Sequence, residues 1–168
     1  DFWRAKSDKP TPVVVFIHDG SFVSSDKSRW QSSPELKQLL DKGVSYAAIN
    51  YRYLTQAPVQ DILHDCARAV QFIRSKSKDW YLDKSRVAAQ GGSAGAGSSL
   101  WLATRDDLAD PSASDPVLRE SSRVVAAVIN STQATYDLTR WESFLGPANP
   151  SWYKSADEGP RFYGFHTL

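Results

Sequence analysis

The chain alternates between short apolar, β-branched runs and longer segments in which apolar residues recur with helical spacing. Two of the short runs, residues 13–17 and 44–50, are typical of buried strands, the first of a strand covered on both sides. A third long strand is predicted at 124–130, and a shorter strand at 86–90. The pattern therefore predicts a sheet that lies inside the molecule.

Helical segments separate these strands. The most regular begins at Val59, because its apolar positions follow the spacing of an amphipathic helix. These positions are Ile62, Leu63, Cys66, Val70 and Ile73. An earlier helix is predicted over 34–42, with Ser33 as its cap and Gly43 as a left-handed residue after it, and another over 94–103. Strands separated by helices pair in parallel, so the predicted fold class is α/β.

Composition narrows the classes of function. The chain has 168 residues, 41% hydrophobic and 23% charged, which fits one globular domain, with the polar segment 105–123 as a surface excursion. Its 20 Lys and Arg residues nearly balance 19 Asp and Glu residues, so it lacks the basic surface that nucleic-acid binding requires. No run approaches the roughly 20 apolar residues of a membrane span. Three histidines and one cysteine lack metal-ligand spacing, and we expect no metal or organic cofactor.

A glycine-rich turn lies between a predicted strand and a predicted helix. Residues 91–95 are Gly-Gly-Ser-Ala-Gly, which fits the pattern G-x-S-x-G. A serine on so sharp a turn has strained backbone geometry, so the residues two positions away, Gly91 and Gly95, must be small. The helix that begins at Ala94 would direct its N-terminal amides at Ser93, where they stabilise a developing oxyanion. The motif indicates a nucleophilic serine.

Two phosphate-binding interpretations of this glycine-rich turn each fail at one residue. A dinucleotide fingerprint needs a glycine where Leu100 stands, and a P-loop needs a lysine where Ser98 stands. A tight turn with an idle serine stays an alternative. Cys66 follows His64 and could suggest a thiol nucleophile, but its place on the apolar helical face predicts a core residue.

A second motif, His-Asp-Gly-Ser-Phe at residues 18–22, follows the first predicted strand. With the glycine-rich turn, it makes the sequence similar to the α/β-hydrolase superfamily, within it to the esterase/lipase group related to hormone-sensitive lipase and the carboxylesterases. In that group an HGGG-type loop after this strand supplies oxyanion amides. Residues 51–53, Tyr-Arg-Tyr, and 83–87 also match such esterases. The resemblance covers about residues 2–130.

The resemblance implies a three-layer α/β sandwich with a mostly parallel sheet, and it assigns roles within both motifs. Ser93 would be the nucleophile. His18 would orient its loop rather than act as the base, because the catalytic histidine of this fold follows the serine in the chain. The amides that would bind the oxyanion are those of Gly20, Ser21 and Ala94.

Two residues depart from the pattern of that group. Asp19 replaces the first glycine of the loop and brings a carboxylate near a site meant to hold negative charge. Ser21 replaces a glycine whose backbone can need positive φ. Because the amide of Ser21 can still donate, the departures predict weakened rather than abolished activity.

The catalytic acid and histidine of this fold should follow Ser93. His166 is the sole histidine after Ser93, and the acids considered with it are Asp137, Asp157 and Glu158. None of these acids stands at a recognisable strand end. Two interpretations of His166 therefore stay open: it is the base, with Asp157 as the acid that orients it, or it is an ordinary histidine near the chain end. No convincing strand follows residue 130. We therefore expect a partial chain, one domain over 1–168 whose sheet is incomplete on its C-terminal side.

The sequence predicts a serine hydrolase that cleaves small-molecule carboxylic esters through an acyl-enzyme on Ser93. Two alternatives stay open at this point: a non-catalytic module of the same fold that keeps the pocket for binding, and a serine peptidase of that fold. Fold alone does not choose among these chemistries. The sequence predicts neither the identity of the ester nor the oligomeric state.

Overall fold

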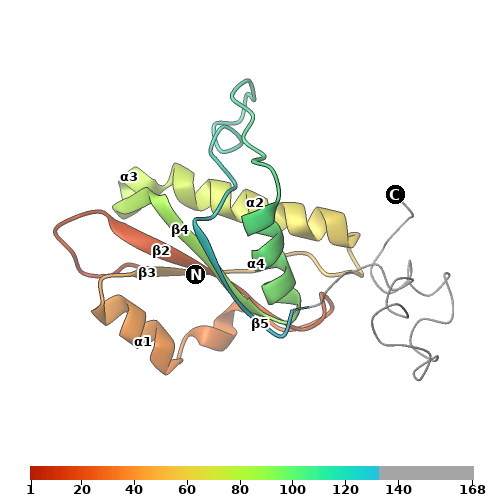
Figure 1. Cartoon of the computed structure of the whole chain (residues 1–168), viewed down its shortest axis with the longest axis horizontal. Coiled ribbons are helices and arrows are strands. Elements are labelled where there is room, and N and C mark those ends of the chain that lie inside the picture. Colours follow the sequence, from red (N-terminus) through yellow and green to blue (C-terminus); the bar gives the residue numbers. More distant parts are fainter. Residues whose placement is uncertain (133–168) are drawn as a thin grey trace, which may run out of the picture.

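The computed structural model of the protein describes residues 1–132, which contain one mixed sheet (Figure 1). The strand order is β1-β3-β2-β4-β5. The strands are β1 (Phe2–Trp3), β2 (Thr11–Ile17), β3 (Ser45–Ile49), β4 (Leu82–Gly92) and β5 (Ala126–Asn130). Every neighbouring pair is parallel except β1 with β3, which is antiparallel. This confirms the mostly parallel sheet expected from alternating strands and helices.

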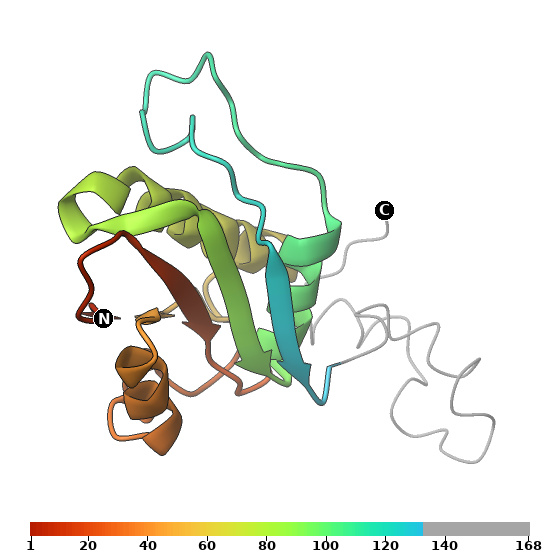
Figure 2. The same ribbon diagram turned by 60° about the vertical axis from the view of Figure 1, so that its left-hand side comes forward.

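Helices cover both faces of the sheet (Figure 2). One face carries η1 (Lys27–Trp30) and α1 (Pro34–Asp41), and the other carries α2 (Val59–Ser75), α3 (Ser77–Trp80) and α4 (Ala94–Thr104). The core divides accordingly: Phe16, Leu36 and Tyr46 pack on the α1 face, whereas Val15, Ile62 and Val70 belong to the larger cluster on the other face. The predicted three-layer α/β sandwich is confirmed.

Local signals at the ends of α1 act as the sequence predicts. The hydroxyl of Ser33 accepts a hydrogen bond from the amide of Leu36 at 3.1 Å, and Pro34 occupies the first turn. After the helix, Gly43 has a φ of +76°, the left-handed conformation that commonly follows a helix end. The chain can then turn back towards the sheet and begin β3.

β4 is longer than the strand predicted at 86–90. At its start, Leu82 is buried and pairs with Thr11 of β2, while the exposed side chains of residues 84–86 hide the strand pattern. At its end, Gly91 and Gly92 still pair with neighbouring strands. Because glycines at a strand end look like a turn in sequence, the pattern underestimated how far the strand reaches towards Ser93.

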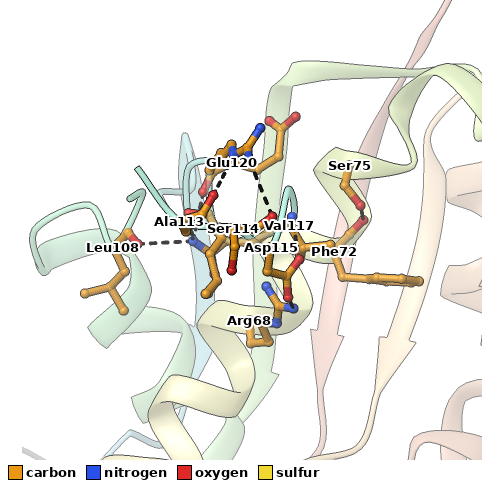
Figure 3. Close-up of polar contacts among 12 residues, drawn as sticks. Arg68, Phe72, Ser75, Leu108, Ala113, Ser114, Asp115, Val117 and Glu120 are labelled. Atoms are coloured by element: carbon orange, nitrogen blue, oxygen red, sulfur yellow. Dashed lines mark hydrogen bonds and ion pairs between the residues drawn. The ribbon is translucent and has the colours of Figure 1, made fainter. Parts of the chain in front are cut away.

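The polar segment between α4 and β5 is a surface excursion, as predicted, and it is fastened to α2. Arg68 pairs with Asp115 of the excursion, and the two side chains face each other in Figure 3. The guanidinium of the buried Arg74 donates to the carbonyl of Ser121 at 2.6 Å. The buried carboxamide of Gln71 donates to the carbonyls of Leu108, Leu118 and Glu120. Side chains of α2 thus satisfy backbone groups of a segment without regular structure.

Candidate active site

Ser93 occupies the turn between the end of β4 and the start of α4. Its backbone has φ 50° and ψ −117°, a conformation that costs a residue with a side chain roughly 1–3 kcal/mol. The amide of Ser93 donates to the carbonyl of Asn130 at 2.9 Å, and the carbonyl of Ser93 accepts from the amide of Gly97 at 3.0 Å. Hydrogen bonds on both sides therefore hold the strained residue, and the predicted strand-to-helix elbow is present.

The two glycines that flank this elbow stand where no side chain fits. A Cβ on Gly95 would lie 2.0 Å from the carbonyl oxygen of Ile17 in β2. A Cβ on Gly91 would lie 2.3 Å from the backbone carbon of Gly95. By contrast, a Cβ on Gly92 would meet its nearest atom at 3.9 Å, an ordinary contact. The close approach of strand and helix, inferred from G-x-S-x-G, is confirmed at both outer glycines.

The side chain of Ser93 is half-buried and does not cap α4. Ala94 is the first residue of this 11-residue helix, so its amide has no intrahelical partner and belongs to the positive end of the helix dipole. The elbow therefore places a hydroxyl that does not cap the helix beside an amide that has no partner within the helix, where the electrostatic potential favours a developing anion.

The loop after β2, like the elbow, contains residues with positive φ. Gly20, Ser21 and Phe22 have φ values of 93°, 54° and 62°. Gly20 is required here, since a Cβ would lie 2.2 Å from the carbonyl oxygen of Ser24. The carbonyl of Gly20 accepts hydrogen bonds from the amides of Val23 and Ser24, which closes the loop into a tight turn. The positive φ expected at Ser21 is confirmed.

Both motifs leave the sheet at the same edge. β2 and β4 are neighbouring parallel strands, with Ile17 in register with Gly91, so the loop and the elbow follow adjacent strand ends. A Cβ on Gly95 would lie 2.8 Å from the carbonyl oxygen of His18, so the first turn of α4 contacts the beginning of the loop. The candidate oxyanion amides of Gly20, Ser21 and Ala94 thus come from adjoining segments.

His18 is fully buried beneath this loop. Its Nδ1 lies 2.9 Å from the carbonyl oxygen of Asp19 and must carry the proton, because a carbonyl can only accept. Burial lowers the pKa of the imidazole below its ordinary value, although the hydrogen bond to Asp19 partly opposes this effect. His18 is therefore neutral at pH 7. Within residues 1–132 its Nε2 has no hydrogen-bond partner. The ring therefore binds the backbone of its own loop, which supports a loop-orienting role.

The carboxylate of Asp19 has a cationic partner that the sequence did not predict. Nη1 of Arg29 donates to both carboxylate oxygens at 2.7 Å. The guanidinium offsets the negative charge that Asp19 brings close to the candidate oxyanion site. A cleft of about 430 Å³ opens beside the elbow on the α1 face; its lining includes Asp19, Arg29, Trp30, Gln90, Gly92 and Asn130.

Several sequence predictions fall elsewhere. His166 and Asp157 lie outside the described residues, as do Asp137 and Glu158, so their roles stay predictions. Cys66 is buried in the core as predicted, and burial raises the pKa of its thiol to about 12, which excludes a thiolate nucleophile at neutral pH.

In the part of the chain that the structure describes, no cluster of three or more His, Cys, Asp or Glu side chains can hold a metal ion. Nor is any helix of residues 1–132 long and apolar enough to span a membrane.

The α/β sandwich, with a strained serine between a parallel strand and a helix, places this protein in the α/β-hydrolase class. Residues 2–155 match the BD-FAE family, and the chain belongs to that family.

Curated relatives are esterases by name. LipM of Mycobacterium tuberculosis, a probable carboxylic ester hydrolase, is 29% identical over 150 residues, which cover 88% of this chain and 34% of LipM. The probable isoprenylcysteine alpha-carbonyl methylesterase ICMEL2 of Arabidopsis thaliana is 32% identical over 90 residues, 54% of this chain and 21% of that protein. This chain therefore matches about a third or less of the length of each relative.

Solved structures show the same fold. The acetyl ester-xyloside bifunctional hydrolase from Caldicellulosiruptor lactoaceticus superposes with a TM-score of 0.72 at 26% identity, over 83% of this chain and 49% of that one. Propionate-bound esterase 2 of Thermogutta terrifontis superposes with a TM-score of 0.72 at 20% identity, over 97% of this chain and 56% of that one. The first likeness supports a hydrolase with this fold, and the second, at 20% identity, supports the fold alone.

Proposed function

We propose that the protein is a carboxylic ester hydrolase and that Ser93 is its nucleophile. The observation that carries the proposal is the backbone of Ser93, with φ 50° at the N-terminus of α4. A glycine would adopt this conformation without strain, so an idle turn has no need of serine here. Strain of roughly 1–3 kcal/mol at a residue with a reactive side chain is typical of functional sites. This argues against the alternative of an idle serine.

The proposed reaction is acyl transfer through a covalent intermediate. Oγ of Ser93 attacks the ester carbonyl carbon while a histidine accepts the hydroxyl proton. The resulting oxyanion is stabilised by amides of the loop and the elbow, those of Gly20, Ser21 and Ala94. The bond to the alcohol then breaks, the histidine returns its proton to the leaving alkoxide, and an acyl-enzyme remains. Water, deprotonated by the same histidine, then attacks the acyl carbon; the bond from that carbon to Oγ of Ser93 breaks, the histidine returns the proton to Oγ, and the acid is released.

For the proton transfers, the chain offers His166 as the base and Asp157 as the acid that orients it. Both assignments are part of the proposal and are tested with it. The substrate class is supported by the relatives, since LipM is named a probable carboxylic ester hydrolase and the Caldicellulosiruptor lactoaceticus protein an acetyl ester-xyloside bifunctional hydrolase. We propose a small-molecule ester as the substrate of this protein.

The test is esterase activity of the protein in its full reading frame, with p-nitrophenyl acetate and butyrate as substrates. Wild type should hydrolyse both esters and be labelled by a fluorophosphonate probe, whereas Ser93→Ala should lose hydrolysis and labelling. Ser99→Ala is the matched control, because Ser99 is a buried serine of the same helix whose hydroxyl donates to the carbonyl of Gly95. His166→Ala and Asp157→Asn test the proposed base and acid.

Each alternative gives a different result. A non-catalytic binding module would show no turnover in a folded sample, and Ser93→Ala would match wild type. A serine peptidase would cleave a p-nitroanilide as well as the ester, and Ser93→Ala would abolish both reactions, whereas an esterase would leave the anilide intact. Ester hydrolysis that survives Ser93→Ala would refute the assignment of the nucleophile.

A further inference from the structure

We propose that Tyr51 is a positioning residue of the oxyanion site, acting together with His18 to aim the amide of Gly20. The inference rests on the proposed function, because it concerns the same reaction. Tyr51 follows β3 and is buried beneath the loop, with 6% of its surface exposed. It is separated from that loop by about 30 residues of sequence, so its role is visible only in the folded structure.

The carbonyls at the start of the loop are held by two side chains. The hydroxyl of Tyr51 lies 2.9 Å from the carbonyl oxygen of His18 and 2.9 Å from that of Asp19. Nδ1 of His18 donates to the same Asp19 carbonyl at 2.9 Å. The single proton of the Tyr51 hydroxyl is shared between these two carbonyls, so the Asp19 carbonyl is held by the Nδ1–H of His18 and by its share of the Tyr51 hydroxyl. Both donors are buried, which fixes the direction of the Asp19 carbonyl towards the core.

Because the peptide bond is planar, fixing the Asp19 carbonyl also fixes the direction of the Gly20 N–H. In a trans peptide the carbonyl and the following N–H point in opposite directions, and the described chain contains no cis peptide. A carbonyl of Asp19 that is held towards His18 and Tyr51 therefore turns the N–H of Gly20 the other way. The neighbouring peptide is fixed in the same manner, since the Gly20 carbonyl is held by the amides of Val23 and Ser24.

The aimed amide has no competing backbone acceptor in the described chain. Among residues 1–132, the amides of Gly20 and Ser21 donate to no backbone carbonyl in the loop or in a neighbouring segment. A donor that is already oriented before the substrate arrives costs no reorganisation when the oxyanion forms. Loss of the Tyr51 hydroxyl should thus affect the transition state more than substrate binding.

The contacts of the Tyr51 ring allow its hydroxyl to be tested separately from its packing. The Tyr51 ring stacks on the His18 ring with centroids 4.1 Å apart, and it meets the Phe22 ring edge-on at 5.7 Å. Phenylalanine retains these ring contacts and removes only the hydroxyl. Tyr46→Phe is a matched control, because Tyr46 is a fully buried tyrosine on the other face of the sheet and its hydroxyl has no hydrogen-bond partner within residues 1–132.

The experiment compares kcat and KM for p-nitrophenyl butyrate. We expect Tyr51→Phe to lower kcat about 10-fold to 100-fold, below the roughly 100-fold to 1,000-fold cost of removing an oxyanion donor outright. KM should stay within about twofold, because the ester in its ground state carries no negative charge. A boronic acid that mimics the tetrahedral intermediate should bind more weakly by a similar factor. Tyr46→Phe should leave kcat and KM unchanged.

A second pair of variants tests the same carbonyl from its other donor. His18→Asn places an N–H at the position of Nδ1, whereas His18→Leu has no donor, so His18→Asn should retain more of kcat. The inference would be overturned if Tyr51→Phe had the same kcat as wild type. It would also be overturned if KM rose by the same factor by which kcat fell. Equal kcat for the two His18 variants would overturn it as well. Failure of the proposed function is recognised separately, by ester turnover that Ser93→Ala does not abolish.

Discussion

Gly95 is the residue at which the elbow and β2 approach most closely, and Gly95→Ala is the sharpest test of this geometry. The added Cβ would lie 2.0 Å from the carbonyl oxygen of Ile17 and 2.8 Å from that of His18. Real Cβ atoms do not come within 3.0 Å of such atoms, so the chain must shift by about 1 Å. Both obstacles are backbone atoms of a buried strand end, which cannot rotate away as a side chain can.

The expected magnitude follows from two opposing terms. Overpacking a buried site costs about 1–3 kcal/mol, and contact with backbone on two sides places this substitution near about 3 kcal/mol. Alanine is the better helix former by about 1 kcal/mol, which offsets part of the cost. We expect Gly95→Ala to lower the free energy of unfolding by about 2 kcal/mol. Gly91→Ala should behave similarly, because its Cβ would lie 2.3 Å from the Gly95 backbone.

The measurement is urea unfolding of the full chain, followed by tryptophan fluorescence and far-UV circular dichroism. Gly92→Ala is the control, since its Cβ would lie 3.9 Å from the nearest atom, and its free energy of unfolding should stay within about 0.5 kcal/mol of wild type. A Gly95→Ala variant that unfolds at the wild-type urea concentration with an unchanged slope would refute the argument. Strand and helix would then be further apart than the structure places them.

Two further predictions concern polar side chains. Gln71→Ala removes the donor shared by the carbonyls of Leu108, Leu118 and Glu120. It should lower the free energy of unfolding by about 1–3 kcal/mol in the same urea assay, whereas Ala at the exposed Gln38 should change it by less than about 0.5 kcal/mol; equal effects would contradict the anchoring role. Arg29→Ala leaves the carboxylate of Asp19 without its ion-pair partner beside the oxyanion loop, so kcat for p-nitrophenyl butyrate should fall several-fold. Adding Asp19→Asn should restore kcat, and a double variant as slow as the single one would show that Arg29 acts in another way.

The order of strands and helices was predictable because each element has a local signal. Apolar β-branched runs, the Ser33 cap and the left-handed Gly43 act within a few residues of one another. The ends of β4 were less predictable. Leu82 joins the strand through pairing with Thr11, which lies far away in sequence. Pairing between distant segments overrides local pattern, so strand length is fixed by the neighbouring strand.

In the candidate site, too, features with a local sequence signal were predictable, and features that depend on contacts between distant segments were not. The elbow follows from G-x-S-x-G, because the motif states a steric requirement between residues two positions apart. The hydrogen bonds from Tyr51 to the loop and the ion pair between Asp19 and Arg29 have no comparable signature. They depend on how β3 and η1 are placed next to β2. A sequence motif can therefore identify the reacting groups before it identifies the residues that orient them.

The distribution of backbone strain also supports the location of the site. Among described residues with a side chain, positive φ occurs at Ser21, Phe22, Ser25, Tyr81, Ser93 and Ser131. All except Tyr81 follow the C-terminal end of β2, β4 or β5, where open α/β sheets bind their ligands. Each such residue costs roughly 1–3 kcal/mol and persists only where the surroundings fix it. Here Asn130 fixes Ser93, and Tyr53 donates to the carbonyl of Ser25. The folded sheet therefore holds strained residues in place at the strand ends where the candidate active site lies.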